Sequence, residues 1–378
     1  MNWVVFKSVC DIPEKIWDEK IAEGHPGKLS NFLKTLEQSC GDREFCYFVS
    51  YDRDEIISCC LITLNNIDGC IFLPMVLSNW VNRIRRIFPH WMVFKIAMTG
   101  TLETAGRHWW YNPDRLSWND YIIALNEQIN SYFHKSHVII FRDFFTHSDL
   151  LPKEISFVLE REGFREVANL PLAIIHLNYS TEKDYLKSLK RRVRATIRKM
   201  LEIIKYNELY VEYVNDFNTL IEEIYPLYLA VNKNAKELKI PPLPKEYFKK
   251  LNDELRGTSN VITIRDKNNI MIGFILSLDN SKIANPFFMG MDYKVAREFY
   301  LLYALLWAAI CCALEKGQSI VDLGVTNYFI KQGLGATLCS MRMFVRFRNP
   351  ILNKLLYPLI PVIFQPQQPM LRSSRGKL

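Results

Sequence analysis

A tyrosine and a lysine near residue 330 have a spacing that suits chemistry on one helix face. Tyr328 and Lys331 are three residues apart, so their side chains are neighbours if this segment is helical. A tyrosine hydroxyl can donate a proton to a leaving group, and a lysine can bind a carboxylate or phosphate. Asp292 is a candidate base. The structural alternatives are a tyrosine bonded within the core, a solvated lysine and a turn aspartate.

Metal-dependent and Ser-His-Asp chemistry have no comparable pattern in this chain. The seven histidines are dispersed, and His134 and His137 lack nearby companions that would complete a ligand set. We therefore expect no metal site.

The cellular compartment is indicated by the cysteines and the hydropathy pattern. Nine cysteines without any CxxC spacing favour reduced core thiols over disulfides. Acidic residues follow the N-terminus too soon for a secretory signal. The uncharged run over residues 299–314 is apolar throughout but shorter than the roughly 20 residues of a transmembrane helix, so we expect a buried helix. We expect a cytoplasmic protein, with a peripheral position at the inner membrane face as the alternative.

Two segments concentrate the positive charge. The net charge is +8, yet residues 183–205 hold nine Lys or Arg against two acids, and residues 341–378 hold seven against none. Such concentration points to contact with something anionic. Lys190, Arg191, Arg194 and Arg198 share one stripe of an expected helix over 182–206. The stripe is either a solvated face or a clamp on an anionic donor such as a charged tRNA, or on a lipid headgroup.

The elements that would position these residues follow a mixed α/β order. A composition of 49% apolar and 23% charged residues is that of a globular chain with a large core. The first half predicts strands and helices up to residue 177, among them a helix over 28–38, a polar turn at residues 52–54 and a helix that begins at Pro152, with an irregular stretch over 65–117. The second half predicts, in order, helix 182–206, strand 209–214, helices 217–233 and 244–255, strands 261–266, 270–279 and 282–291, helix 297–315, strand 319–324, helix 326–333 and strand 336–347.

The segment LGVTNYFIKQGLGATLCSMRMFVRFRNP, residues 323–350, resembles the closing motif of the FemAB-like, double-lobed GNAT acyltransferases. The matching positions are Gly324, Thr326, Tyr328, Lys331, Leu334, Gly335 and Ala336. Three further segments are similar to the same family in order and spacing: the basic helix segment 189–200, residues 225–235 and residues 287–310. The resemblance implies an α/β (mixed α+β) fold of tandem GNAT-like lobes, each a mixed, mostly antiparallel sheet flanked by helices. It divides the chain into lobes 1–178 and 179–349 and a basic, apolar tail, 350–378.

The resemblance implies an N-acyltransferase that moves an acyl or aminoacyl group from a thioester or ester donor to an amine acceptor. The implied donors are acyl-CoA, acyl-carrier protein or aminoacyl-tRNA, and the implied acceptor is a small-molecule amine. In this fold the fourth and fifth strands separate, which leaves backbone groups free to pair with a pantetheine arm. The fourth strand would end at Phe288–Met291.

The next helix would then begin near Ala296 and direct its amides at the donor's pyrophosphate. Lys294 and Arg297 would add charge, and Gly290 and Met291 would lie at the cofactor. Gly290 is the single glycine where acetyl-CoA binders usually have several, and a solvated loop that caps a core helix is the alternative.

Two departures from the family motif keep other functions open. Val325 stands where the family has arginine, and Phe329 where it has glutamate. A non-catalytic scaffold, with Phe329 or Met291 filling the space between the strands, is therefore one alternative, and an aminoacyl-tRNA-dependent Fem-type ligase is another. The tail from residue 350 is either a membrane contact or, as we favour, a cover for the second lobe, and action on lipid acceptors is a third alternative.

Overall fold

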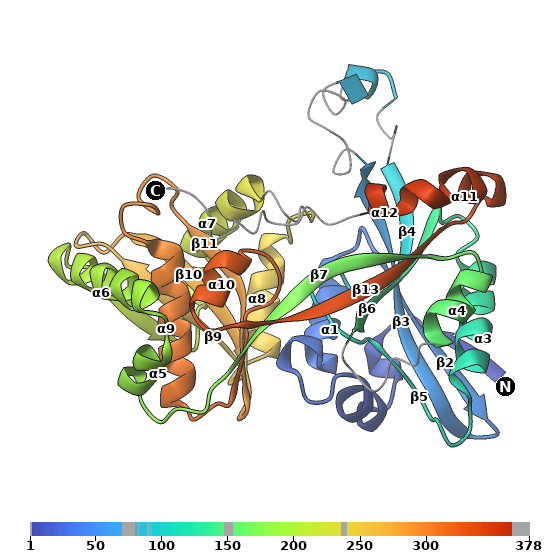
Figure 1. The fold of residues 1–378 in the computed structure, drawn as a ribbon, viewed down its shortest axis with the longest axis horizontal. Helices are drawn as coiled ribbons and strands as arrows, with labels where there is room; N and C mark the ends of the chain where they lie inside the picture. The colour runs from blue at the N-terminus through green and yellow to red at the C-terminus, as the bar shows by residue number, and fades with distance from the viewer. Residues whose placement is uncertain are drawn as a thin grey trace. The chain divides into compact units, whose positions relative to one another are not determined.

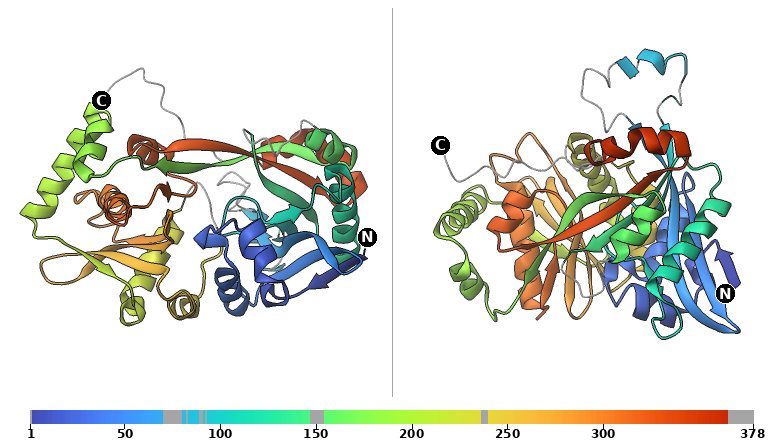
Figure 2. Two further views of the ribbon diagram at one scale, coloured as in Figure 1. Left: turned by 90° about the horizontal axis from the view of Figure 1, so that it is seen from below. Right: turned by 45° about the vertical axis from the view of Figure 1, so that its right-hand side comes forward.

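The computed structural model describes residues 2–69, 80–81, 83–88, 91, 93–146, 154–235 and 240–364 of the chain. These residues form two compact units, and neither unit is continuous in sequence. Unit 1 comprises residues 2–23, 40–170 and 340–364, and unit 2 comprises residues 24–39 and 171–339. Strands β7 (Arg165–His176) and β13 (Thr337–Phe347) each begin in one unit and end in the other, and Figure 2 shows both as long continuous ribbons.

Unit 1 is built on a mostly antiparallel sheet (Figure 1). Its strand order is β1-β2-β3-β4-β6-β13, with β5 paired to β3 and a parallel pairing between β4 and β6. The bounds are β1 Asn2–Phe6, β2 Glu44–Asp52, β3 Glu55–Asp68, β4 Val93–Thr99, β5 Trp109–Tyr111 and β6 Val138–Phe145. The β2–β3 turn falls at the predicted polar residues 52–54.

The helical elements of unit 1 supply the other half of its core. Segments η1 (Val9–Asp11) and η2 (Lys15–Ile21) precede β2, and α3 (Trp118–Tyr132) and α4 (Glu154–Arg161) flank β6 in the sequence. Ser117 caps α3 by accepting from the Asp120 amide. Buried aromatic side chains of α3, such as Trp118 and Tyr121, pack in one cluster with the apolar residues of β2, β3 and β6.

Unit 2 carries the second sheet, in the order β7-β12-β11-β10-β9-β8. The bounds are β8 Tyr210–Val214, β9 Ser259–Arg265, β10 Met271–Asp279, β11 Ile283–Met291 and β12 Ile320–Asp322. Every residue of β9 and β10 is buried. This is the pattern of strands covered on both faces, and it explains their nearly continuous apolar sequence.

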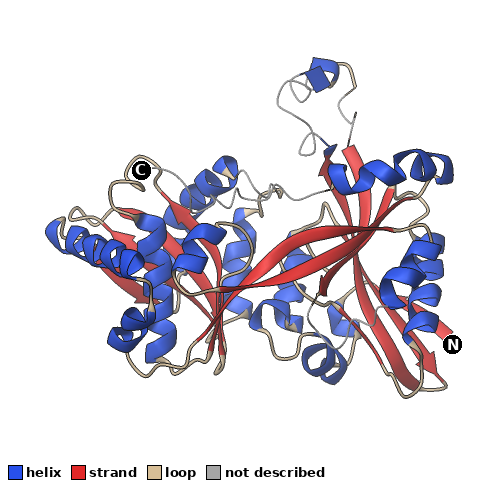
Figure 3. Cartoon of the chain, viewed as in Figure 1, coloured by secondary structure: helices blue, strands red, loops and turns tan. Residues whose placement is uncertain are grey.

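Helices cover both faces of this second sheet (Figure 3). A Cβ added at Gly290 would meet α7, and one added at Gly273 would meet α9, although the two glycines lie on neighbouring strands at adjacent registers. Helices α7 and α9 therefore pack on opposite faces. The helical bounds are η3 Pro26–Lys28, α1 Ser30–Ser39, α5 Glu182–Ser188, α6 Arg191–Tyr206, η5 Asn218–Leu220, α7 Ile221–Asn234, α8 Lys245–Glu254, α9 Leu301–Glu315 and α10 Tyr328–Gly333.

The expected irregular stretch over residues 65–117 is wrong only in part, because residues 100–108 and 112–117 lie in neither a strand nor a helix. Strand β3 continues to Asp68, and β4 and β5 fall within the stretch. Strand β4 lies between β3 and β6, so its residues Ile96–Met98 are buried, and no alternation of apolar and polar residues marks it. The expected helix start at Pro152 lies outside the described residues.

The single basic helix expected over 182–206 is also wrong, because the chain breaks between α5 and α6. Leu189 and Lys190 are extended, with ψ near 157° and 143°. Leu189 is buried, and a Cβ at Gly335 would lie 3.4 Å from it. The Arg194 guanidinium donates to the carbonyls of Lys187 and Leu189 at 3.0 and 2.8 Å. Burial of Leu189 and this side-chain bridge stabilise the break.

The segment after β13 covers unit 1, which corrects the expectation that it covers the second lobe. It forms α11 (Pro350–Leu356), η6 (Tyr357–Leu359) and α12 (Ile360–Ile363). Ile360 and Phe364 are buried against Val345 and Phe347 of β13 and Val138 and Ile140 of β6. These apolar side chains cover one face of the sheet at β6 and β13. The rest of the tail, from residue 365, lies outside the described residues.

Candidate functional site

Strands β11 and β12 separate almost as soon as they pair. Their parallel pairing covers only Ile283 with Ile320 and Ala284 with Val321. Strand β12 ends at Asp322, whereas β11 runs on to Met291. The edge of β11 from Asn285 onward therefore has no β12 partner, and its outward backbone groups remain open to an extended ligand. The expected separation of these two strands is confirmed.

A hydrogen-bonded side-chain set marks the point of separation. Asn285 is buried and donates from Nδ2 to the carbonyl of Asp322 at 3.0 Å. His25 Nε2 lies 3.0 Å from Asp322 Oδ2, and His25 Nδ1 accepts from the Gly27 amide at 3.2 Å. With Nδ1 as an acceptor, Nε2 carries the proton and donates to Asp322. The Gly324 amide donates to the other carboxylate oxygen at 2.8 Å.

The loop from Leu323 to Asn327 has an unusual backbone. Gly324, Thr326 and Asn327 have φ values of 68°, 68° and 52°. Two of these residues carry a Cβ, which makes the left-handed region costly, and such strain persists only where the surroundings enforce it. Lys331 supplies part of that enforcement, because its buried Nζ donates to the carbonyls of Leu323 and Val325 at 2.6 Å each.

The remaining residues of the closing motif lie on and after α10. Tyr328 is buried at the start of α10, whereas its neighbour Phe329 is 75% exposed. Phe329 therefore does not fill the space beside β11, as the scaffold alternative required. Gly335 has a φ of 102°, and a Cβ there would lie 3.0 Å from the Tyr185 hydroxyl. Tyr185 donates to the Leu334 carbonyl, and burial raises the pKa of its phenol, so this donor stays protonated.

Gly290 and Met291 are packed into the sheet. A Cβ at Gly290 would lie 2.3 Å from the Phe274 ring and 2.6 Å from the backbone of Leu227. Glycine is required here because α7 approaches the strand closely. Met291 is buried opposite Gly273. The close approach places the side of Gly290 against α7.

The connection from β11 to α9 corrects the expected helix start near Ala296. Helix α9 begins at Leu301, after Tyr300 in the left-handed region with φ 54°. The Asp292 carbonyl accepts from the amides of Val295 and Ala296, and its carboxylate accepts from the Lys294 amide at 2.9 Å. Asp292 thus holds a turn. Lys294 and Arg297 are exposed in the loop ahead of the helix.

The basic stripe is divided between structural and exposed roles. Arg194 bridges the α5–α6 break, whereas Lys190, Arg191 and Arg198 are exposed. Two α6 cations outside the predicted set approach the first turn of α9. Lys199 Nζ lies 5.6 Å from the centre of the Tyr300 ring. The charge of Arg192 acts on Tyr303, whose pKa burial nevertheless raises.

The negative charge of the Asp322 carboxylate acts on the thiol of Cys339 in β13. Burial, and secondarily the negative charge of Asp322, raise the pKa of Cys339. The group therefore stays protonated at neutral pH, which makes it a poor nucleophile. The described residues also contain no cluster of three or more His, Cys, Asp or Glu side chains placed to hold a metal ion.

Sequence reasoning identified one side of this site and missed the other. The motif positions Gly324, Thr326, Tyr328 and Lys331 do come together around one loop. His25 was missed because it lies almost 300 residues before its partner and has no neighbouring histidine. A signal was present in His25-Pro26-Gly27, a turn sequence directly ahead of a predicted helix.

Comparison with known proteins shows the fold. The chain superposes on FemX with a TM-score of 0.58 and 12% identity, covering 96% of this chain and 100% of that one. It superposes on a tandem GNAT protein from the clavulanic acid biosynthesis pathway with a TM-score of 0.53 and 8% identity, covering 92% and 99%. The chain has a tandem GNAT fold. Identities this low carry no information on substrate.

Sequence comparison gives a weaker relation. The chain is 22% identical over 274 residues to a protein of Mycobacterium tuberculosis (strain CDC 1551 / Oshkosh) described as putative 8-amino-7-oxononanoate synthase 2. The match covers 71% of this chain, which spans about a third of that relative's length, 35%. No protein-family model matches the chain. No helix within the described ranges has both the length and the apolar character needed to cross a bilayer.

Proposed function

We propose that the protein is an N-acyltransferase that forms an amide from a thioester or ester donor and an amine acceptor. The observation that carries the proposal is the separation of β11 from β12 after Ala284 and Val321, in a chain with a tandem GNAT fold. The open strand edge offers amides and carbonyls in the spacing that an amide-containing arm can pair with.

The donor would lie along β11 with its anionic end at the start of α9. The first turn of a helix presents amides that bonds within the helix do not use, and the partial positive charge there favours a phosphate. Lys199 and Arg192 lie near this turn, and Lys294 and Arg297 are exposed in the loop before it. Acyl-CoA fits this chemistry, and the phosphates of acyl-carrier protein or aminoacyl-tRNA share it.

The transfer needs a neutral amine, a stabilised oxyanion and a proton for the leaving group. Both ring nitrogens of His25 are engaged, Nδ1 by the Gly27 amide and Nε2 by Asp322, so we assign His25 a positioning role, and the amine would enter as the neutral form present in solution. Backbone amides on the open edge of β11 would stabilise the oxyanion. The Lys331 ammonium acts through position, since it holds the loop that carries Gly324 and Thr326. Tyr328 remains the candidate proton donor for the departing thiolate or alkoxide. Asp292 has a structural role in this proposal, because it stabilises the turn after β11.

A donor screen tests the proposal. Purified protein is incubated with hydroxylamine and, in separate reactions, with acyl-CoA thioesters, acyl-carrier protein and aminoacyl-tRNA, and hydroxamates are detected by mass spectrometry. We expect turnover with one donor class. Binding of no donor and turnover with none would remove the proposal.

A pair of α6 variants tests where the donor binds. Lys199→Gln should raise the KM for the donor several-fold at low salt, because one favourable charge near its phosphates is lost. Lys205→Gln, an exposed substitution at the other end of the same helix, serves as the control. A tRNA donor would show a steep loss of affinity with salt, whereas a thioester held along a strand would not.

A further inference from the structure

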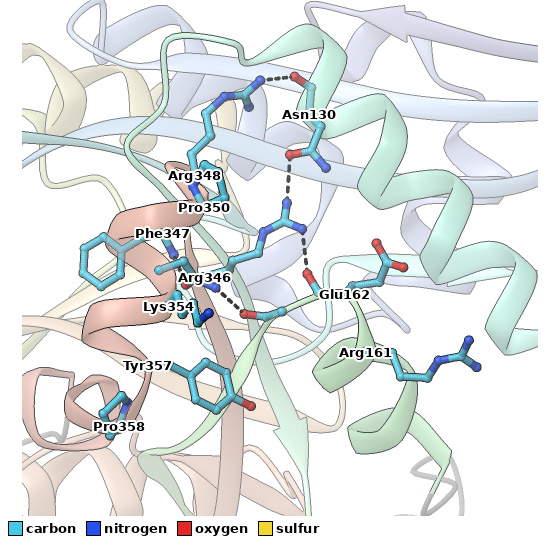
Figure 4. Close-up of a pocket in the computed structure, with 12 residues that line it drawn as sticks. Asn130, Arg161, Glu162, Arg346, Phe347, Arg348, Pro350, Lys354, Tyr357 and Pro358 are labelled. Carbon is cyan, nitrogen blue, oxygen red and sulfur yellow. Dashed lines mark hydrogen bonds between the residues drawn. The ribbon is translucent and has the colours of Figure 1, made fainter.

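A pocket of about 600 Å³ lies in unit 1, within the size range of small-molecule sites. It is formed by the end of β13, the turn after α4, and residues of α3, α11 and η6 (Figure 4). Its charged lining consists of Arg161, Glu162, Arg346, Arg348 and Lys354. The lining therefore holds four cations and one carboxylate.

The two half-buried pocket arginines, Arg346 and Arg348, differ from Arg43 and Arg265. Arg43 pairs with Glu103, and Arg265 pairs with both oxygens of Glu223. In the part of the chain that the structure describes, no carboxylate forms an ion pair within 4.0 Å with any of the four pocket cations, although the charge of Glu162 acts on Arg346 from a longer distance. The Glu162 carboxylate accepts from Asn126 Nδ2 at 2.8 Å.

The two strand arginines are held by neutral acceptors. Arg346 donates to the Glu162 carbonyl at 2.8 Å and to the side-chain oxygens of Asn126 and Asn130 at 3.0 and 2.8 Å. Arg348 donates to the carbonyls of Phe133 and Asn130. These bonds use three of the five N–H groups of Arg346 and two of the five of Arg348. The remaining donors have no acceptor among the described residues.

The pocket wall is fixed before any ligand arrives. Asn353 donates to the Gly163 carbonyl at 2.9 Å and accepts from the Phe347 amide at 2.9 Å, which ties α11 to β13 and to the turn after α4. The Arg346 guanidinium also stacks 4.4 Å from the centre of the Phe164 ring. Arginines held in this way lose little side-chain entropy when they bind an anion.

Holding positive charges together without an anion costs free energy. Burial lowers the pKa of Arg346 to about 10; the charge of Glu162 opposes this shift and the charge of Arg348 adds to it, and the group remains charged at neutral pH. An anion in the pocket would offset both the desolvation and the mutual repulsion. Paired Nη and Nε donors match the oxygens of a phosphate group.

We propose that this pocket binds the phosphate group of a small organic phosphate, carried either by a soluble metabolite or by a phospholipid headgroup. The lipid source has a physical basis in the exposed side chains beside the pocket: Ile351, Leu355, Leu359 and Val362 are 71, 68, 50 and 72% exposed. The site lies in unit 1 and is independent of the proposed transfer reaction.

Binding of inorganic phosphate and sn-glycerol 3-phosphate by calorimetry tests the soluble source. Flotation with phosphatidylglycerol vesicles, against phosphatidylcholine alone, tests the lipid source. The variant Arg161→Gln/Lys354→Gln removes two exposed cations that make no hydrogen bond to the described protein, so it should fold normally. We expect it to weaken binding by about tenfold or more.

Lys15→Gln, an exposed unit 1 substitution outside the pocket, should leave binding unchanged. Binding of soluble phosphates alone assigns the metabolite source. Vesicle binding that Ile351→Ser/Leu355→Ser also weakens assigns the lipid source. Absence of binding in both assays, or equal binding by the pocket double variant and the wild type, would overturn the proposal.

Discussion

His25 and Asp322 meet through a hydrogen bond of 3.0 Å at the point where β11 and β12 part. The histidine caps η3, and the aspartate is the last residue of β12. This bond ties the loop after β12 to a segment from the beginning of the chain. The position of the loop after β12 therefore depends on two side chains that are distant in sequence.

The first prediction concerns this pair. Asp322→Asn should reduce acyl transfer about tenfold, because a neutral amide accepts less strongly than a carboxylate from His25 Nε2 and from the Gly324 amide, which together hold the loop after β12. His25→Gln should reduce it similarly, because the same loop loses its bond to η3. Steady-state kinetics from pH 5.5 to 9 measures both. His134→Gln, an exposed substitution in unit 1, is the control. An unchanged kcat/KM in both variants would refute the positioning role of this pair.

The second prediction separates position from chemistry at Lys331. Lys331→Met should lower the free energy of unfolding by about 2–4 kcal/mol, because the carbonyls of Leu323 and Val325 lose the buried ammonium that donates to both of them. Urea unfolding followed by circular dichroism measures this change. Lys294→Met, in an exposed loop, should change stability by less than about 0.5 kcal/mol. A stable Lys331→Met protein without activity would instead place Lys331 in the chemistry.

The third prediction concerns the close approach of α7 to β11. Gly290→Ala should destabilise unit 2 by about 1–3 kcal/mol, because the new methyl group would overlap the backbone of Leu227 and the ring of Phe274. Gly41→Ala has open space around it and is the matched control. Thermal unfolding of the two variants should differ by several degrees. Equal melting temperatures would contradict the packing argument.

The fourth prediction concerns covalent catalysis. Because its pKa is raised, Cys339 should be mostly protonated at pH 7.5, and Cys339→Ala should retain transfer activity. Raising the pH increases the thiolate fraction, so alkylation of Cys339 should accelerate steadily above pH 9. Peptide mass spectrometry after timed iodoacetamide treatment follows this residue separately from the exposed Cys10. Rapid alkylation of Cys339 at neutral pH would show that the thiol is activated.

Sequence reasoning found the order of elements in the second half because each strand there is apolar and is bounded by turn residues such as Asp266–Asn269. It failed where tertiary contacts overrule local pattern. The break at Leu189 cannot be read from a basic amphipathic run, since burial beside Gly335 decides it. Strand β4 has no alternation because the strands on either side bury it.

The site was predicted in part for the same reason. The closing motif is contiguous, so its residues were found together. The structural role of Lys331 depends on where the carbonyls of Leu323 and Val325 point, which spacing does not reveal. Spacing also cannot show whether the departure from the family motif at Phe329 fills the space beside β11; the exposure of Phe329 shows that it does not.

The pairing of β13 with β6 has a consequence for how this polypeptide matures on the ribosome. Residues 341–347 pair with residues 138–145, so the earlier strand keeps one bare edge until residues 341–347 have been translated. Its apolar side chains Val138 and Ile140 lack the cover of Val345, Phe347, Ile360 and Phe364 during that interval. Nascent chains should therefore depend on chaperones, and translation that stops before residue 341 should yield a product destined for proteolysis.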